Sequence, residues 1–450
     1  MVFSSFEFLF RFLPIFFIIY YFTSKKYKNV ALFAGSIAFY TVGEAEYVLL
    51  LLLCVFINYF MGQVMYRWPG EKRGLWQKTI LALALGYDFG ILFFFKYSGL
   101  SATLPLGISF YTFQIAAYMI DVYREKIPAE KSFVNLGTYL TMFPQLIAGP
   151  IINYADVRER LIERSVTPEQ FEDGLKTLIL GLGAKVIVAD RIGMLWKNIQ
   201  SIGFASISTP LAWMGAFAYS IELYFDFAGY SMMARGLGRM LGFEIPVNFR
   251  HPYISKSVTE FWRRWHITLG KWFREYVYIP LGGNRKGKLR TFFNLFVVWS
   301  LTALWHGAGY NYLIWGASLL FLLGVEKLFL LPYLDRSRVL CHAYLLFVVP
   351  LTWVAFAVTD VQQLGIYYTR MFPFLPQSGG IVNQQDYVKY LGDFWPLFLL
   401  GILFSTPIPY RIYRAVKKSW LGSIAVAVIL ALSMYYLAVS TNNPFMYFNF

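Results

Sequence analysis

SLTALWHGAGYNYLIWG, residues 300–316, joins two long apolar stretches and places His306 near the end of the first. An α-helix needs about 20 apolar residues to cross a bilayer. A titratable side chain at membrane depth costs free energy and is therefore a functional candidate. Gly307, Ala308 and Gly309 follow His306, and such small residues would let a substrate approach the imidazole closely. The segment therefore predicts a membrane helix that carries a reactive group.

The composition of the whole chain agrees with a membrane environment. Of the 450 residues, 58% are hydrophobic, 20% are aromatic and only 14% are charged, whereas soluble proteins carry about 25% charged residues. The net charge of +15 does not indicate a nucleic-acid partner, because the basic residues form short runs between apolar stretches. The chain is therefore predicted to be an all-α, polytopic integral membrane protein.

The apolar runs predict about 10–12 membrane helices. We place them at residues 5–22, 29–42, 46–66, 78–98, 106–121, 173–190, 210–230, 291–307, 310–332, 340–358, 392–408 and 419–440. The first range has neither a basic start nor a small-residue cleavage site, so we interpret it as a retained helix. The apolar stretch 133–152 lies between charged stretches and predicts a re-entrant hairpin that protein must shield.

The distribution of Lys and Arg predicts the orientation. Basic runs at 24–28, 122–131, 335–338 and 411–418 are assigned to the cytoplasm by the positive-inside rule. The weakly charged loop 360–388 and the C-terminus then lie outside. We expect a chain that crosses the membrane several times.

Residues 250–290 are basic and aromatic and only moderately apolar. They predict an interfacial helix, because tryptophan rings and guanidiniums favour that depth. Ser257 and Glu260 have the spacing of a capping box, and Glu260 and Arg263 are expected to form an intrahelical pair. The glycine-rich turn at 281–288 is either a phosphate cradle or a plain cytoplasmic loop.

Four histidines occur, and two of them are candidates for chemistry. A neutral imidazole at His306 can take a proton from an attacking hydroxyl and return it later. His266 follows Trp262 by four residues and would share its helix face. For each, local sequence alone supports a purely structural role equally well. His251 and His342 are predicted to be surface and interface residues.

Two acids, Glu222 and Asp226, are four residues apart in an apolar run and would share a helix face. Burying both requires partners, and we expect Tyr224, Tyr230 or Arg235. Two cysteines, far apart in the chain, predict neither a disulfide framework nor a metal site.

The motifs WHGAGYNYLIWG (305–316) and FWRRWHITLGKWFREYVYIPLGGNRKG (261–287) resemble the signature of the membrane-bound O-acyltransferases. More narrowly, the chain resembles membrane subunits of the alginate O-acetyltransferase type. Further matching stretches are MVFSSFEFLF at the start, 104–124, 143–151, 222–243 and 248–266. The resemblance implies one family domain over 1–450, with its signature at about 104–316 and its weakest part at 361–450.

The resemblance implies a multi-pass protein of the bacterial cytoplasmic (inner) membrane, with a ring of tilted helices around a central funnel or tunnel. It assigns catalysis to His306 and His266. Trp305, Asn311 and Asn294, close to His306 in sequence, are expected to bind or position substrate. Four further residues, Arg263, Arg264, Trp262 and Trp265, are expected to bind substrate. The basic residues Arg263, Arg264 and Lys271 and the run 285–290 would meet an anionic donor at the cytoplasmic face.

The function implied is transfer of an acyl group, expected to be acetyl, from a cytoplasmic thioester for O-acetylation of an exported polysaccharide such as alginate. The donor would be acetyl-coenzyme A or an acyl-carrier thioester, with no permanently bound cofactor. Expected partners are membrane lipid and an extracytoplasmic SGNH-type acetyltransferase or the polysaccharide itself. Peptidoglycan, cellulose or teichoic acid D-alanylation remain alternatives inside the family, and a transporter or channel remains one outside it.

Overall fold

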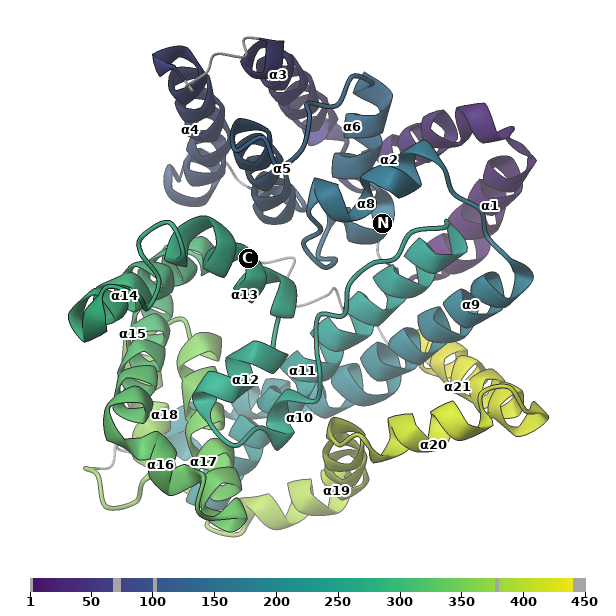
Figure 1. Ribbon diagram of the computed structural model, residues 1–450. Helices are drawn as coiled ribbons and strands as arrows, with labels where there is room; N and C mark the ends of the chain where they lie inside the picture. The colour runs from purple at the N-terminus through teal and green to yellow at the C-terminus, as the bar shows by residue number, and fades with distance from the viewer. Residues whose placement is uncertain (1–2, 68–73, 100–102, 377–379, 440–450) are drawn as a thin grey trace. The chain divides into compact units, whose positions relative to one another are not determined.

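The computed structural model describes residues 3–67, 74–99, 103–376 and 380–439 (Figure 1). Helices dominate, and no β-strand occurs in the described part of the chain. Every range predicted to be a membrane segment overlaps a helix. The all-α class is therefore confirmed.

The chain forms two compact units. The first comprises the described residues up to Gly181 together with Tyr230–Val247, and the second comprises Leu182–Gly229 together with Asn248–Val439. The prediction of a single family domain over 1–450 is not tested by this division.

The first unit contains the N-terminal helices. They are α1 (Leu13–Phe22), α2 (Lys28–Glu44), α3 (Val48–Arg67), α4 (Leu75–Tyr97), α5 (Ile108–Tyr123), α6 (Phe133–Thr141), α7 (Phe143–Leu146), α8 (Tyr154–Ile162) and most of α9 (Pro168–Gly183). Helix α4 packs against α3 and α5, and α2 packs against α6. The stretch predicted to be re-entrant forms the short helices α6 and α7, which are broken at Met142 and almost wholly buried in protein.

The second unit contains the remaining helices. They are α10 (Asp190–Ile202), most of α11 (Thr209–Met240), α12 (Val258–Arg264), α13 (Ile267–Phe273), α14 (Gly287–His306), α15 (Tyr310–Val325), α16 (Leu331–Leu334), α17 (Arg338–Ala357), α18 (Val361–Met371), α19 (Asp386–Ser405), α20 (Ile408–Val416) and α21 (Trp420–Val439). Helix α15 packs against α14 on one side and α17 on the other (Figure 1). This three-helix group carries the histidine of the WHG motif.

Six helical segments of the described residues are long and apolar enough to cross a membrane. They are Lys25–Arg67, Leu75–Tyr97, Tyr310–Leu334, Arg338–Ala357, Asp386–Ser405 and Trp420–Val439. The first includes both α2 and α3. The polytopic architecture is therefore supported, while the count of 10–12 membrane helices and the central funnel stay predictions.

The interfacial helix predicted within 250–290 is not continuous. Helix α12 ends at Arg264 and α13 begins at Ile267. Trp265 and Trp272 are 1% and 5% exposed, so these rings pack inside the protein and not among headgroups. The prediction failed because an aromatic and basic composition does not distinguish a helix at the membrane interface from a segment packed inside the protein.

Candidate active site

His266 lies at the break between α12 and α13. Its backbone has φ 44° and ψ 53°, a left-handed conformation that non-glycine residues rarely adopt. The break also means that Trp262 and His266 do not share a helix face, contrary to the sequence prediction. Strained backbone of this kind persists only where neighbouring contacts hold it in place.

Those contacts come from Asn248, which lies 18 residues earlier in the chain. The Asn248 carbonyl accepts from the Ile267 N–H at 3.0 Å. Its side-chain Oδ1 accepts from the Thr268 N–H at 3.1 Å and from Thr268 Oγ1 at 3.0 Å. One buried asparagine thus satisfies the first amides of α13 and holds the chain reversal at His266.

The same asparagine selects the tautomer of His266. A backbone N–H can only donate, so the Thr268 N–H requires Asn248 to present its oxygen. His266 Nδ1 lies 3.3 Å from that oxygen and must therefore carry the proton. In this tautomer Nε2 carries the lone pair and acts as a hydrogen-bond acceptor.

Burial makes His266 a weak base. The side chain is 2% exposed, and burial lowers the pKa of His266 from 6.5 to about 3. The Phe227 ring packs edge-on against the imidazole at 4.8 Å between ring centroids. His266 therefore stays neutral at physiological pH and is suited to accepting a hydrogen bond, not to removing a proton.

A cavity of about 940 Å³ extends from His266. Trp262, Trp265, Trp299 and Phe273 form its apolar wall. The basic residues of its lining are Arg263, Arg274, Arg285, Lys286 and Lys327, and no Asp or Glu of the described residues belongs to the lining. A pocket of this size accommodates a drug-sized ligand, and the excess of positive charge favours an anionic one.

His306 is the last residue of α14 and is 5% exposed. Aromatic rings surround its imidazole: the centroids of Trp315 and Phe356 lie 5.0 Å away, and that of Trp305 lies 4.6 Å away. His306 is not among the residues that line the cavity. It is a packed imidazole at a helix end.

Two features connect His306 to the cavity. Val298, Trp299 and Thr302 line the cavity from α14, and His306 lies four residues after Thr302, on the same helix face. In addition, the Trp305 ring lies 6.5 Å from the His266 ring. His306 is thus one helical turn beyond the last cavity-lining residue of α14, and Trp305 contacts both histidines.

The loop after His306 requires its glycine. A Cβ on Gly309 would lie 2.3 Å from the side-chain oxygen of Asn311, well inside normal contact. Asn311 is fully buried, and its Nδ2 donates to the Phe356 carbonyl at 3.0 Å. Asn311 therefore joins the start of α15 to the end of α17 by a hydrogen bond. Phe356, at the end of α17, packs on His306.

The other predicted ligands divide into two groups. Arg263, Trp262 and Trp265 line the cavity, as expected for residues that meet the donor. Asn294 is fully buried and donates to the Gly283 carbonyl at 2.8 Å, so it shapes the glycine turn at the cavity wall. The side chains of Trp305 and Asn311 contact neighbouring helices instead, and whether any of these residues binds substrate stays a prediction.

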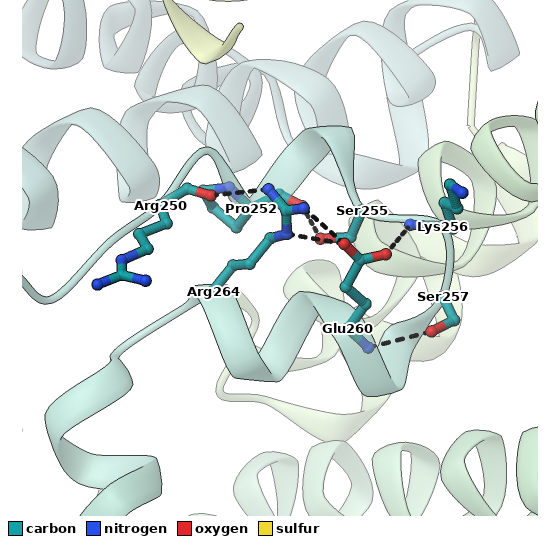
Figure 2. A network of polar contacts seen from close by, with 7 residues as sticks. All are labelled: Arg250, Pro252, Ser255, Lys256, Ser257, Glu260 and Arg264. Atoms are coloured by element: carbon teal, nitrogen blue, oxygen red, sulfur yellow. Dashed lines mark hydrogen bonds and ion pairs between the residues drawn. The ribbon is translucent and has the colours of Figure 1, made fainter. Parts of the chain in front are cut away.

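Arg264, the fourth predicted donor ligand, belongs to the polar network in Figure 2. Its Nε and Nη2 donate to Glu260 Oε1 at 2.9 and 2.6 Å, and Nη1 donates to the Arg250 carbonyl at 3.2 Å. The predicted pair of Glu260 with Arg263 is therefore wrong, because the i,i+4 partner is Arg264. Arg264 and Lys271 are not cavity-lining residues.

The predicted cap at the start of α12 is confirmed. Ser257 Oγ accepts from the Glu260 N–H at 3.0 Å, and Glu260 Oε2 accepts from the Lys256 N–H at 2.9 Å (Figure 2). Burial raises the pKa of Glu260, but the bonds from Lys256 and Arg264 outweigh it and lower the pKa. The carboxylate therefore stays ionised and holds the turn that leads into α12.

Glu326 makes contacts with the start of α12 that the sequence did not predict. This fully buried residue follows α15 and accepts from the amides of Val258 and Thr259 at 2.5 and 2.8 Å and from Thr259 Oγ1 at 2.6 Å. A carboxylate at a helix N-terminus satisfies its first amides. No local signal reveals Glu326 or Asn248, since both act across distant parts of the chain.

Asp226 of α11 has a partner that the sequence analysis did not name. Asp226 Oδ1 lies 2.6 Å from Lys185 Nζ, and Lys185 also pairs with Asp190 at 2.7 Å. Glu222 is 9% exposed and packs closely against Gly193. Asp226 is thus paired with a lysine of the π-helical segment Ala184–Ala189, which the sequence analysis did not name as a partner.

Comparisons with known proteins identify the family of the chain. Residues 124–333 match the family model described as MBOAT, membrane-bound O-acyltransferase family. A probable alginate O-acetylase of Pseudomonas putida is 34% identical over 489 residues, with 100% of both chains covered. The peptidoglycan O-acetyltransferase of Helicobacter pylori is 27% identical over 522 residues, 100% of this chain and 98% of the relative. A teichoic acid D-alanyltransferase of Bacillus subtilis is 30% identical over 224 residues, 47% of this chain and 56% of the relative.

Both histidines lie inside the region that the family model matches. Each of these relatives is named as an acyl-transfer enzyme and none as a transporter or channel. The apolar helices are those of a multi-pass membrane protein. The chain therefore belongs to the membrane-bound O-acyltransferase family, and it is an acyltransferase.

Proposed function

We propose that this protein moves an acetyl group from a cytoplasmic thioester across the bacterial inner membrane for O-acetylation of an exported polysaccharide such as alginate. The full-length similarity to a probable alginate O-acetylase supports this acceptor class. The relative named as a D-alanyltransferase covers only 47% of the chain, which favours acetyl over D-alanyl.

The observation that carries the proposal is the basic cavity at His266. Among the described residues of its lining, five are cationic and none is acidic, which suits the phosphates of coenzyme A or of a carrier-bound phosphopantetheine arm. The tryptophan wall suits the uncharged part of such a donor. A thioester that enters this cavity would place its reactive end toward His266 and Trp305.

In this proposal the two imidazoles have different roles in the transfer. His266 Nε2, neutral and fixed by Asn248, accepts a hydrogen bond from the donor or acceptor and orients it. His306 takes the proton of the acceptor hydroxyl as its oxygen bonds to the thioester carbonyl carbon. The carbon–sulfur bond breaks, and His306 returns the proton to the departing sulfur, so that protons balance.

The acceptor hydroxyl comes, in this proposal, from the outer side of the membrane. It belongs either to the polysaccharide itself or to an extracytoplasmic SGNH-type partner that passes the acetyl group on. The peptidoglycan O-acetyltransferase of Helicobacter pylori covers this chain as fully as the alginate relative does. Peptidoglycan is therefore the second candidate acceptor, favoured by that similarity alone.

The proposed donor site is tested by substituting two adjacent arginines. Arg263 lines the cavity, whereas Arg264 is paired with Glu260 outside it. With purified protein and radiolabelled acetyl-coenzyme A, Arg263→Gln is expected to raise KM about five- to tenfold, in line with loss of one charge-assisted bond. Arg264→Gln should change KM less than about twofold, because its charge is already satisfied by Glu260.

Equal KM values for the two variants would refute the cavity as the donor site. Failure of the purified wild-type protein to bind or turn over acetyl-coenzyme A would instead point to a carrier-protein thioester. The acceptor is tested separately by mass spectrometry of cell-envelope glycans with and without the gene. Loss of acetyl from alginate supports the proposal, and loss from peptidoglycan alone overturns it.

A further inference from the structure

Helix α20 (Ile408–Val416) has membrane segments on both sides. Helix α19 ends at Ser405 and α21 begins at Trp420, and both are long and apolar enough to cross a bilayer. An extended residue spans at most about 3.6 Å, so neither end of α20 lies more than about 15 Å from a membrane-spanning helix. Helix α20 is therefore confined to the membrane surface.

Helix α20 is strongly amphipathic. Ile408, Ile412 and Val416 recur every four residues and form an apolar stripe. Arg411 and Arg414, three residues apart, lie on the part of the helix surface beside this stripe, and Lys417 and Lys418 directly follow the end of α20 at Val416. No residue of α20 is buried, and Ile408 and Ile412 are 51% and 61% exposed.

The charged residues of this segment are all cationic. Residues 411–418 hold four cations, Arg411, Arg414, Lys417 and Lys418, and the last acidic residue of the chain is Asp393. Tyr410 and Trp420, 55% and 71% exposed, flank the cationic run with rings that favour interfacial depth. Repulsion within such a run is relieved by an anionic partner.

We propose that α20 and the adjacent Lys417–Lys418 form a binding surface for anionic phospholipid headgroups. The apolar stripe inserts at the boundary between headgroups and acyl chains, and the cations meet headgroup phosphates. A lipid surface is the occupant because the helix is joined to membrane segments at both ends. A soluble acidic protein would leave the apolar stripe uncovered.

The surface continues toward the segment that carries the catalytic residues. The His251 ring lies 6.5 Å from the Tyr410 ring, and its environment includes the charges of Arg264 and Arg411. His251 is three residues from Asn248, which holds His266. A headgroup near Arg411 therefore borders the polar network of Figure 2.

The test uses purified full-length protein and native mass spectrometry with phosphatidylglycerol and phosphatidylcholine. The wild type should bind phosphatidylglycerol at least about tenfold more tightly, since each cation near an anionic surface contributes roughly fivefold. The Arg411→Gln/Arg414→Gln/Lys417→Gln/Lys418→Gln variant should lose at least about tenfold of this preference. The charge-keeping Arg411→Lys/Arg414→Lys variant should retain it.

An unchanged preference in the four-glutamine variant, or no preference in the wild type, overturns the proposal. Retained acetyl-coenzyme A binding in each variant shows that the protein is folded. If the four-glutamine variant does not fold, the salt dependence of the wild type decides the question. The phosphatidylglycerol preference should fall steeply between low and high salt, and a salt-independent preference contradicts a headgroup site.

Discussion

His266 and His306 are both nearly inaccessible imidazoles, yet their surroundings differ in kind. A polar network around Asn248 holds His266, and the ring lines a cationic cavity. Aromatic rings enclose His306 at the end of a long helix, one turn beyond that cavity. This difference is the basis for our proposal that His266 orients a substrate and that His306 acts on it in a site shielded from water.

The largest effect is expected for His306→Ala. Loss of a general base should lower the transfer rate about 10²- to 10⁴-fold while folding and insertion persist. Acetylation of the cellular glycan and turnover by purified protein measure it. The matched control is His342→Ala, near the start of α17 and far along that helix from the Phe356 that packs on His306. Full activity of the His306 variant would reverse the assignment of roles.

A smaller loss is expected for Asn248→Ala, which removes one acceptor from three donors and releases the His266 ring from its fixed orientation. We expect about a 10- to 100-fold lower rate, typical of a lost orienting contact. Asn248→Asp keeps the acceptor but adds a charge that favours the imidazolium, so it should raise the pKa of His266 and weaken activity mainly at low pH. Identical pH–rate profiles for the Asn248→Asp variant and the wild-type enzyme would contradict this link.

Glu326→Gln should affect stability more than chemistry. The amide keeps the shape but loses the charge that satisfies the start of α12. The expected loss is about 1–3 kcal/mol, seen as a lower midpoint of thermal inactivation in detergent, with the rate at low temperature changed less than about threefold. A large rate loss at unchanged thermal stability would show that Glu326 acts in the reaction.

The smallest effect is expected for the contribution of His266 to the pH dependence of protein stability. The pKa of His266 is about 3 in the folded protein and 6.5 in its ordinary state, so the unfolded chain takes up a proton first as pH falls. Stability from this group is present above about pH 6.5 and falls by about 2 kcal/mol by about pH 5. Thermal inactivation of His266→Gln should therefore respond less to a shift from about pH 7 to about pH 5 than the wild type does. Equal responses would show that His266 is not buried as a neutral ring.

The helices were predictable because long apolar runs specify membrane helices through length and composition alone. The motif around His306 likewise placed the reactive candidate on α14. The break at His266 was not predictable, since it depends on Asn248, which lies 18 residues away and makes contact only after folding. The pairing of Asp226 with Lys185 was missed for the same reason, because the partner lies on another helix.

The adjacent arginines show why a basic cluster in a sequence does not by itself predict a ligand-binding site. Sequence alone treats Arg263 and Arg264 alike, whereas helix geometry points one into the cavity and the other toward Glu260. A charge that is satisfied locally cannot be distinguished from one that awaits a ligand until its neighbours are placed.

The central proposal is that the cavity lined by His266 opens to the cytoplasm and brings a thioester to within one helical turn of His306. Thr302, which lines the cavity one turn before His306, tests it most directly. In a background with Cys54→Ala and Cys341→Ala, Thr302→Cys should react with a membrane-impermeant thiol reagent in inside-out vesicles. Saturating acetyl-coenzyme A should slow that reaction at least about tenfold, because an occupied site excludes the reagent. Reaction only in right-side-out vesicles, or at a rate that acetyl-coenzyme A leaves unchanged, would contradict the account.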